Sequence, residues 1–531
     1  MLTNSGPARR AGAREWAGLA VLALPTILLA LDLTVLYMAL PHLGSELGAG
    51  NTQLLWISDI YGFMIAGVLI TMGTLGDRVG RRRLLLIGAT AFIGASVLAA
   101  YSTSAEMLIV ARALLGLAGA TLTPSTLSLI TNMFTDPRQR SLAIGVWLTS
   151  FSLGGAIGPA VGGALLERFW WGSVFLLGVP VMVLLLVTGP RLLPEHRSPG
   201  AGRLDLVSAV LSLAAILPIV YGIKQIAKDG VRVVPLLAVA AGVAVAVLFV
   251  RRQRSIADPL LDLRLFGNRR FTGALVSMLL GMVTLYSFTF YFTQYLQLVE
   301  GLSPFVAGLW FIPMAATTIV AAMAAPLIAR RLPPPRVIAA GLVLAAGGFA
   351  SLALIDAGSG LTLIIVGGVV IAVGINPLLV LSTDLIVSSA PPERTGSAAA
   401  MQETSGELGS SLGIAVFGTL GTALYSAQIT GTLPGGLPPE AAETARDSFA
   451  GAFATAADLP AEIGTALVTA AREAFLTGMN AVTLISAGVL LAIAVLVVMA
   501  LKGVRPLGEA TAETGQEETG RDEAERGGAV V

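Results

Sequence analysis

The sequence contains no cysteine and only two histidines, His42 and His196, which lie far apart in the chain. Disulfide frameworks and the Cys and His clusters that bind zinc or iron–sulfur centres are therefore excluded. Lysine is scarce as well, since only Lys224, Lys228 and Lys502 are present and none of them follows a glycine. The glycine-rich loop ending in Gly-Lys, with which ATP-driven pumps hold phosphates, is thus missing. We expect a protein that is not an enzyme and that needs no metal or other cofactor.

Charge is also rare, because 12% of the 531 residues are charged while 55% are hydrophobic. Soluble proteins average about 25% charged residues, so this composition, with a mean hydropathy of +0.82, predicts an integral membrane protein surrounded by a lipid bilayer. The net charge of +1 argues against a nucleic-acid partner, because binding of that kind depends on neutralising phosphates.

Hydrophobic segments of the right length are abundant. A helix needs roughly 20 apolar residues to cross the hydrocarbon core of a bilayer. Such segments lie near residues 16–40, 52–75, 84–103, 106–131, 140–165, 172–190, 204–223, 233–250, 271–298, 303–328, 337–355, 361–385, 398–425 and 477–501. The first is too long for a signal peptide and lacks a cleavage site, so we expect it to be retained. The predicted fold is an all-α membrane protein with 14 transmembrane helices.

The basic residues orient these segments. With the N-terminus inside, most of the 33 lysines and arginines fall in loops on the inner side, whereas Lys224 falls in an outer loop. Both termini are then cytoplasmic, and the acidic residues 502–531 have the composition of a disordered tail. The excess of arginine over lysine points to a GC-rich bacterial genome, hence to a bacterial cytoplasmic membrane.

Residues 426–476 interrupt the pattern of short loops. Two alanine-rich stretches there carry apolar residues at helical spacing and end at Leu-Pro or at glycine. We expect a small helical hairpin over the outer mouth, which acts either as a passive cap or as a gate.

Five ionisable residues lie well inside predicted spans, namely Asp32, Asp59, Arg112, Glu403 and Glu407, whereas Asp384 lies near the inner end of its span, where it can reach water. An ionisable group in the hydrocarbon core is costly unless it faces water or a partner, so each is a candidate site residue. Glu403 and Glu407 are four residues apart and therefore share one helix face. Two neighbouring carboxylates in a low dielectric do not both ionise cheaply, so one of them is expected to hold an exchangeable proton or cation. Arg112 compensates Asp59 or Asp32, and a purely structural network of these three remains the alternative.

The fifth span carries a series of small or helix-breaking residues: Gly145, Gly154, Gly158, Pro159, Gly162 and Gly163. Glycines at this spacing clear one helix face for close approach of a neighbour, and the proline removes a backbone hydrogen bond. We therefore expect a tightly packed helix that is able to hinge.

The loop after the second span reads Gly73-Thr-Leu-Gly-Asp77-Arg78-Val-Gly80-Arg81-Arg82-Arg83. Its glycines allow a tight turn, and an aspartate at a helix N-terminus caps the helix while pairing with arginine. Anchoring by positive charge accounts for the arginines but not for this order of residues.

Taken together, these motifs resemble those of the major facilitator superfamily, in particular its fourteen-span drug:proton antiporter branch, over nearly the whole chain. Residues 73–82 are similar to the loop signature GxLxDRxGRR of that family. Residues 108–120, in which Arg112 precedes Gly116 by four, are similar to its fourth-helix signature. The glycine series of the fifth span is similar to the signature of drug antiporters, and residues 31–41 are similar to the first-helix signature of the branch.

Within the branch, WISDIYGF around Asp59 and AAAMQETSGELGSSLG around Glu403 and Glu407 resemble exporters of quaternary ammonium compounds and lipophilic cationic dyes. The resemblance implies that these acids, with the acid of the first span, serve proton coupling and cation recognition. Gln402 and the uncharged stretch 313–318 stand where some members carry acids. This departure favours monovalent or neutral drugs over divalent cations.

The resemblance also implies a domain organisation in which two six-helix bundles rock around a central site. The expected parts are residues 1–190 as the N-terminal bundle, 191–270 as a linker with two additional helices, 271–501 as the C-terminal bundle including the outer hairpin loop 426–476, and 502–531 as the tail. Asp77 and the arginines after it would latch the bundles in the outward-open state. The family usually works as a monomer, which is our expectation here.

The mechanism implied is a competition between a proton and a cationic drug for the same charge. Asp32 and Glu407 would carry protonation-linked substrate binding, Glu403 and Asp59 would assist, and Arg112 would tune their protonation. Aromatic residues that would line the cavity through cation–π contacts, unless they only pack, are Trp56, Tyr61, Tyr286, Phe290, Tyr291 and Trp310.

The expected function is therefore proton-coupled efflux of small lipophilic compounds, most of them cationic. A dedicated exporter that protects its host from one secondary metabolite is the alternative within this class. A proton-linked nutrient importer has the same fold, but the antiporter glycine series argues against it. A receptor or scaffold would not need acids buried in the membrane.

Overall fold

The computed structural model describes residues 11–195, 205–256, 259, 261–355, 360–390 and 395–504. Within these ranges the chain is helical and contains no strand, and fourteen of its helices are long and apolar enough to cross a membrane. The predicted fold class and number of spans are thereby confirmed. The predicted acidic tail lies outside the described residues from residue 505 onward.

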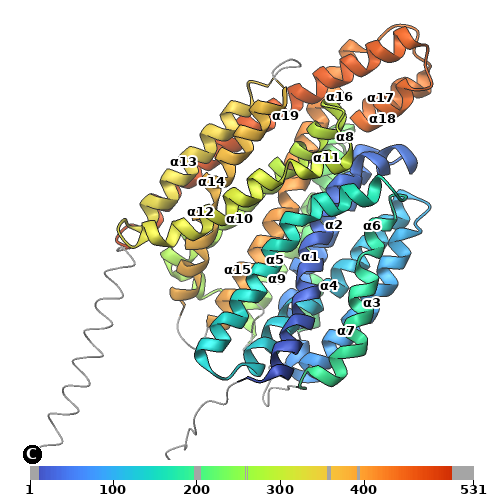
Figure 1. Ribbon diagram of the computed structural model, residues 1–531. Coiled ribbons are helices and arrows are strands. Elements are labelled where there is room, and N and C mark those ends of the chain that lie inside the picture. Colours follow the sequence, from blue (N-terminus) through green and yellow to red (C-terminus); the bar gives the residue numbers. More distant parts are fainter. Residues whose placement is uncertain are drawn as a thin grey trace, which may run out of the picture.

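The N-terminal helices pack into one bundle, drawn in blue to green in Figure 1. They are α1 (Ala13–Glu46), α2 (Asn51–Val79), α3 (Arg81–Ala100), α4 (Ala105–Met133), α5 (Pro137–Leu166), α6 (Ser173–Leu176) and α7 (Gly178–Leu192). Helix α1 lies along α5 and α7, and α4 lies between α2 and α3. This arrangement brings α1, α2 and α4, which carry the candidate charges of this half, into contact with one another.

The C-terminal helices form a second bundle, drawn in yellow to red. They are α10 (Arg269–Gln294), α11 (Pro304–Leu309), α12 (Ile312–Ala329), α13 (Pro334–Leu352), α14 (Gly360–Ser388), α15 (Thr395–Gly413), α16 (Thr419–Thr432) and α19 (Ala461–Ala500). Wide π-helical turns extend α10 through Tyr295–Val299 and join α15 to α16 through Ile414–Gly418. Such turns are frequent at functional sites in helices.

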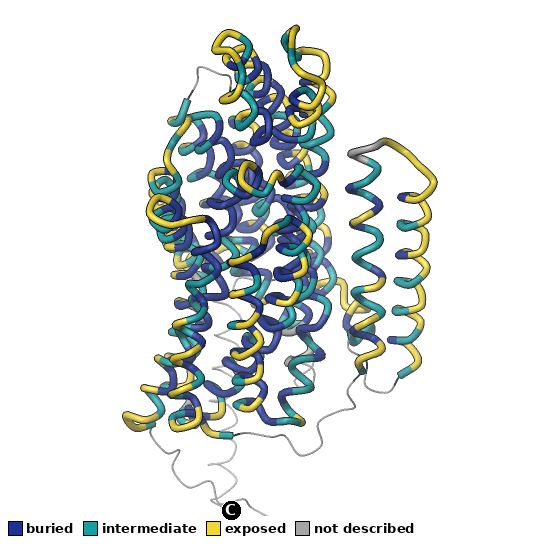
Figure 2. Tube along the Cα trace, turned by 90° about the vertical axis from the view of Figure 1, so that its right-hand side faces the viewer, coloured by how far each residue is buried: buried dark blue, intermediate teal, exposed yellow. Residues whose placement is uncertain are grey.

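Two further helices, α8 (Leu206–Asp229) and α9 (Val233–Ser255), stand as a pair beside the bundles, as Figure 2 shows. Helix α8 contacts both α2 and α16, whereas α9 packs mainly on α8 and is largely exposed. Asp205 caps the start of α8 and lies 2.9 Å from Arg252 of α9. Although partial burial raises the pKa of Asp205, hydrogen bonds from Ser208 and Arg252 bring the pKa below its ordinary value.

The long segment between the last two spans is helical. It forms α17 (Pro439–Asp447) and α18 (Phe449–Ala456), and the hydroxyl of Tyr425 in α16 donates a hydrogen bond to the carbonyl of Ala445. The predicted arms differ from the observed ones, because both short helices come from the first alanine-rich stretch. The second stretch is the first part of the 40-residue helix α19, since nothing after Pro460 breaks the helical pattern.

The two bundles meet mainly at the end that carries α17 and α18, which we call the hairpin end. There, Gly163 of α5 lies against the backbone of Pro304 in α11, and a side chain at Gly44 of α1 would meet Ala450 of α18. The close glycine contacts between bundles that the structure describes all lie between this end and the level of Glu407. The space between the bundles is thus closed at the hairpin end. The opposite end is called the Asp77 end below.

Candidate functional site

The best-defined polar contact inside the N-terminal bundle joins α1 to α4. Nη1 of Arg112 lies 2.6 Å from Oδ2 of Asp32, and the side chain of Arg112 is fully buried while 9% of that of Asp32 is exposed. Nε of Arg112 also donates to the carbonyl of Ile57 in α2, at 3.2 Å. The choice that the sequence left open is thereby decided, because Arg112 pairs with Asp32 and not with Asp59.

Aromatic rings complete the surroundings of this pair. The guanidinium carbon of Arg112 lies 4.4 Å from the ring centroid of Tyr61 and 5.9 Å from that of Phe175. The close approach of α4 to α2 depends on Gly116, because a Cβ atom there would lie 2.5 Å from the carbonyl oxygen of Tyr61. The fourth-helix signature thus has a physical basis, since the glycine one turn after the arginine lets α4 pack closely on α2.

Asp59 has a partner that the sequence did not suggest. Nζ of Lys224, from α8, lies 2.7 Å from Oδ2 of Asp59 and 4.0 Å from the ring centroid of Trp56. Both charged side chains are buried, with 1% of Lys224 and none of Asp59 exposed. The predicted seventh span ended at residue 223, whereas α8 continues to Asp229 and carries Lys224 inside the helix. The sequence did contain one signal for this pairing, because an apolar run leads directly into Lys224.

The carboxylates of α15 have no such partner. Glu403 and Glu407 are half-buried, and the structure pairs neither with a basic group of the residues it describes. Oε2 of Glu407 is buried and accepts no hydrogen bond. At this level α15 presses against α2, because a Cβ atom at Gly62 would meet Ser411 and, at 3.6 Å, the carbonyl oxygen of Glu407.

Phenols from both bundles lie within electrostatic range of Glu407. Tyr37 of α1, Tyr61 of α2 and Tyr286 of α10 all lie within electrostatic range of its carboxylate. Tyr37 lies within electrostatic range of Asp59 as well as of Glu407. The predicted acids therefore lie around one central region where α1, α2, α10 and α15 meet. In this region two acids carry a counter-ion and two do not.

Only Gly80 separates α2 from α3, so the predicted loop is a single residue, and Asp77 lies in the last turn of α2 and does not cap α3 as expected. The residues around this turn form a compact network within the N-terminal bundle. Nε and Nη2 of Arg81 lie 2.8 and 2.7 Å from Oδ1 of Asp77, whereas Arg78 is exposed. Glu195, just after α7, accepts from the backbone N–H of Arg82 at 3.2 Å. Its carboxylate also lies within 3.7 Å of the guanidinium groups of Arg82 and Arg83. Glu195 was missed in the sequence because it is far from the motif and shows no spacing that relates it to these arginines.

Replacing Gly80 with alanine is expected to destabilise the protein by about 1–3 kcal/mol. Gly80 has φ +115°, which side chains rarely adopt, and a Cβ atom there would collide with Glu195. The measurement is the midpoint of thermal unfolding in detergent. Gly73→Ala is the matched control, because its Cβ atom would be 3.9 Å from that of Pro124, an ordinary contact. Equal midpoints for the two variants would contradict this role of Gly80.

The glycine series of α5 divides into two contacts. Gly154, Gly158 and Gly162 face α1, where added side chains would meet Ile27, Thr34 and Val35. Pro159 and Gly163 face α11 of the other bundle, at the hairpin end. The signature therefore serves both the packing of α5 within its bundle and its contact with the other bundle.

Gly154→Ala is expected to reduce the yield of folded protein and its transport, because the new Cβ atom would overlap the carbonyl oxygen of Ile27. Backbone gives way less easily than a side chain, and such overpacking typically costs about 1–3 kcal/mol. Gly145→Ala is the control, since no atom lies within 4 Å of a Cβ atom there. Yield is measured by size-exclusion chromatography of the detergent extract. A normal yield of Gly154→Ala would show that α1 and α5 tolerate separation.

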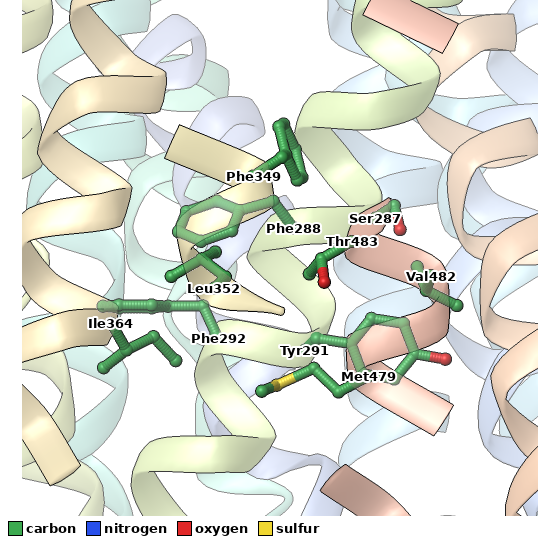
Figure 3. A pocket seen from close by; sticks show the side chains of 10 residues that line it. All are labelled: Ser287, Phe288, Tyr291, Phe292, Phe349, Leu352, Ile364, Met479, Val482 and Thr483. Carbon is green, nitrogen blue, oxygen red and sulfur yellow. The ribbon is translucent and has the colours of Figure 1, made fainter. Parts of the chain in front are cut away.

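A separate apolar cavity lies inside the C-terminal bundle between α10, α13, α14 and α19 (Figure 3). Its lining residues are Ser287, Phe288, Tyr291, Phe292, Phe349, Leu352, Ile364, Met479, Val482 and Thr483. It has room for little more than a single water molecule and includes none of the candidate acids. This cavity is therefore not the candidate site, and Tyr291, a predicted cavity aromatic, packs here.

Comparisons with known proteins identify transporters that resemble this chain over most of its length. A family model described as Major Facilitator Superfamily matches residues 22–414. Multidrug efflux pump LfrA of Mycolicibacterium smegmatis is 46% identical over 493 residues, which cover 93% of this chain and 97% of LfrA. Methyl viologen resistance protein SmvA of Salmonella typhimurium is 37% identical over 90% of this chain and 96% of its own. A tetracenomycin C resistance and export protein of Streptomyces glaucescens is 32% identical over 92% of each chain.

Solved structures share the fold at low sequence identity. A bacterial homolog of the human lysosomal transporter Spinster superposes with a TM-score of 0.67 at 17% identity, over 92% of this chain and 99% of that chain. A peptide transporter solved with sulfate superposes with a TM-score of 0.58, also at 17% identity, over 92% and 96% of the two chains. These likenesses concern the arrangement of the helices.

Proposed function

The chain belongs to the Major Facilitator Superfamily, and from this membership we propose that it exports lipophilic organic cations in exchange for protons. It is a drug efflux transporter, like the efflux pump and the resistance exporters to which it is similar, and it is not an enzyme. The chemical class of the substrate, the coupling ion and the roles of single residues are parts of the proposal.

The observation that carries the proposal is the contrast between paired and unpaired acids. Asp32 and Asp59 each lie against a basic side chain, whereas the half-buried Glu403 and Glu407 have no basic partner among the described residues. A carboxylate inside a membrane protein without a counter-ion binds either a proton or a cation. Three tyrosines lie within electrostatic range of Glu407, and aromatic rings are groups that organic cations prefer.

Transport then follows from competition at Glu407. The Asp77 end carries most of the arginines, and we place it, with both termini, in the cytoplasm. The conformation described here is closed at the hairpin end, so its central site would face the cytoplasm and accept a cation. Rocking of the bundles would then expose the site outside, where a proton displaces the cation. In this scheme the Asp77 network stabilises the outward-open state, and the contacts of α5 with α11 stabilise the state that is closed at the hairpin end. A single chain is sufficient for transport, so the protein would act as a monomer.

Proton release from inverted bacterial membrane vesicles tests this proposal. The vesicles are acidified inside, a pH-sensitive dye reports the gradient, and ethidium is added as a monovalent lipophilic cation. We expect ethidium to dissipate the gradient in vesicles that contain the protein and not in vesicles without it. The absence of any response to a panel of lipophilic cations would overturn the cation proposal.

A dedicated exporter of one secondary metabolite is the second candidate, because two of the relatives described above are named for resistance to a single compound. The two candidates differ in breadth. A susceptibility screen over structurally unrelated drugs separates them, since a multidrug pump raises resistance to many of them and a dedicated pump to one class.

A further inference from the structure

The contact between α8 and α2 contains a cation site that is already filled. Trp56 offers the face of its indole ring and Asp59 offers its carboxylate, and the ammonium of Lys224 lies at 4.0 Å from the ring centroid and 2.7 Å from Oδ2. A ring face beside a carboxylate is the combination that recognises an alkylammonium group. The occupant is therefore a side chain of the protein that has the charge of the proposed substrate.

Lys224 is not needed to dock α8 on the bundles. The hydroxyl of Ser212 in α8 donates to the carbonyl of Gly67 in α2 at 3.1 Å. An apolar cluster of Phe63, Val220 and Ala415 also packs α8 against α2 and against the π-helical turn after α15. The buried lysine adds a desolvation cost to a contact that is already apolar, and buried ion pairs rarely add stability. Its presence calls for another explanation.

Charge supplies that explanation. With Lys224 in place the Asp59 site is neutral, as is the Asp32 site with its arginine. Of the two unpaired acids of α15, one is expected to stay protonated because two neighbouring carboxylates do not both ionise cheaply. The region then has one negative charge to offer, and Tyr37 lies within electrostatic range of both Asp59 and Glu407.

We propose that Trp56 and Asp59 form a second cation subsite, that Lys224 is its resident occupant, and that this occupancy restricts export to compounds with one positive centre. The inference rests on the proposed function and adds a residue that determines specificity. Without the lysine, the carboxylate of Asp59 is left for a cation of the substrate, so that Asp59 and Glu407 together can each ionise against one positive centre of a dication. An ammonium group a few ångströms from the second positive centre of a dication repels that centre. The repulsion is large enough to lower the affinity for the dication by more than about tenfold.

The experiment compares two cations that differ by one quaternary nitrogen, decyltrimethylammonium with one centre and decamethonium with two. Proton release from inverted vesicles is measured for wild type, Lys224→Met, Lys224→Arg and the double variant Lys224→Met with Asp59→Asn. We expect Lys224→Met to raise the ratio of the decamethonium rate to the decyltrimethylammonium rate by at least about tenfold. Lys224→Arg should keep the wild-type ratio, and the double variant should return it to within about threefold, since the added charge is gone.

The inference is overturned if wild type already exports both cations equally, if Lys224→Met leaves the ratio unchanged, or if the gain persists in the double variant. Lys224→Gln guards against misfolding of the methionine variant. If neither uncharged variant yields folded protein while Lys224→Arg does, the pair is a requirement of the fold and the inference is wrong. A wild type that responds to no cation would instead remove the proposed function, which is a distinguishable result.

Discussion

Glu407→Gln is expected to abolish proton release driven by ethidium, with a fall in rate of at least about 100-fold, the magnitude typical of losing a group that transfers a proton. Glutamine keeps the size and polarity of the side chain but neither ionises nor attracts a cation. Because Glu407 has no basic partner among the described residues, its neutralisation leaves no unpaired charge behind. The variant should therefore fold normally, and the loss should be one of coupling.

The matched control is Asp384→Asn, which removes a carboxylate that is exposed on α14. It should keep proton release close to the wild-type rate. Glu403→Gln is expected to lie between the two, since Glu403 shares the helix face of Glu407 but lies one turn away from it. Wild-type proton release by Glu407→Gln would contradict the central role of this residue, and equal losses in all three variants would point to a general effect of removing charge.

The number of spans was predictable because the bilayer sets a length that hydropathy reports directly. The acids were predictable as candidates for the same reason, since charge in an apolar run is costly wherever the helix lies. What hydropathy does not contain is the rotation of one helix about its axis relative to another. The partner of Arg112 was open for that reason, since α1 and α2 each carry one aspartate and only the rotation of the two helices decides that Asp32 faces Arg112 while Asp59 faces Lys224.

Lys224 shows a different limit. The positive-inside rule assigns a lysine at the end of an apolar run to a solvent-exposed loop. It takes no account of a buried partner far away in the sequence. Asp59 is 165 positions earlier and lies in a different part of the fold, so only the contact between α8 and α2 relates the two residues. The break between α17 and α18 at Ser448 was missed for a local reason, because alanine-rich sequence is helical with or without a turn and the position of the turn depends on packing.

Arg112→Ala is expected to destabilise the protein by about 3–5 kcal/mol and to abolish transport, because it leaves Asp32 charged and buried without a partner. The measurement is thermal unfolding in detergent, followed by tryptophan fluorescence, together with proton release from vesicles. Arg112→Lys keeps the charge but has no planar fork to serve Asp32 and the carbonyl of Ile57 at once. It should therefore recover only part of the stability.

The double variant Arg112→Met with Asp32→Asn separates stability from function. Replacing both members of a buried pair by uncharged residues is often neutral for stability, so its unfolding midpoint should return close to that of wild type. Transport should stay lost, because the guanidinium also lies over the ring of Tyr61, which is within electrostatic range of Glu407. If the double variant released protons at the wild-type rate, the pair would be purely structural. The coupling would then lie in α15 alone, with α1 and α4 only supporting the site.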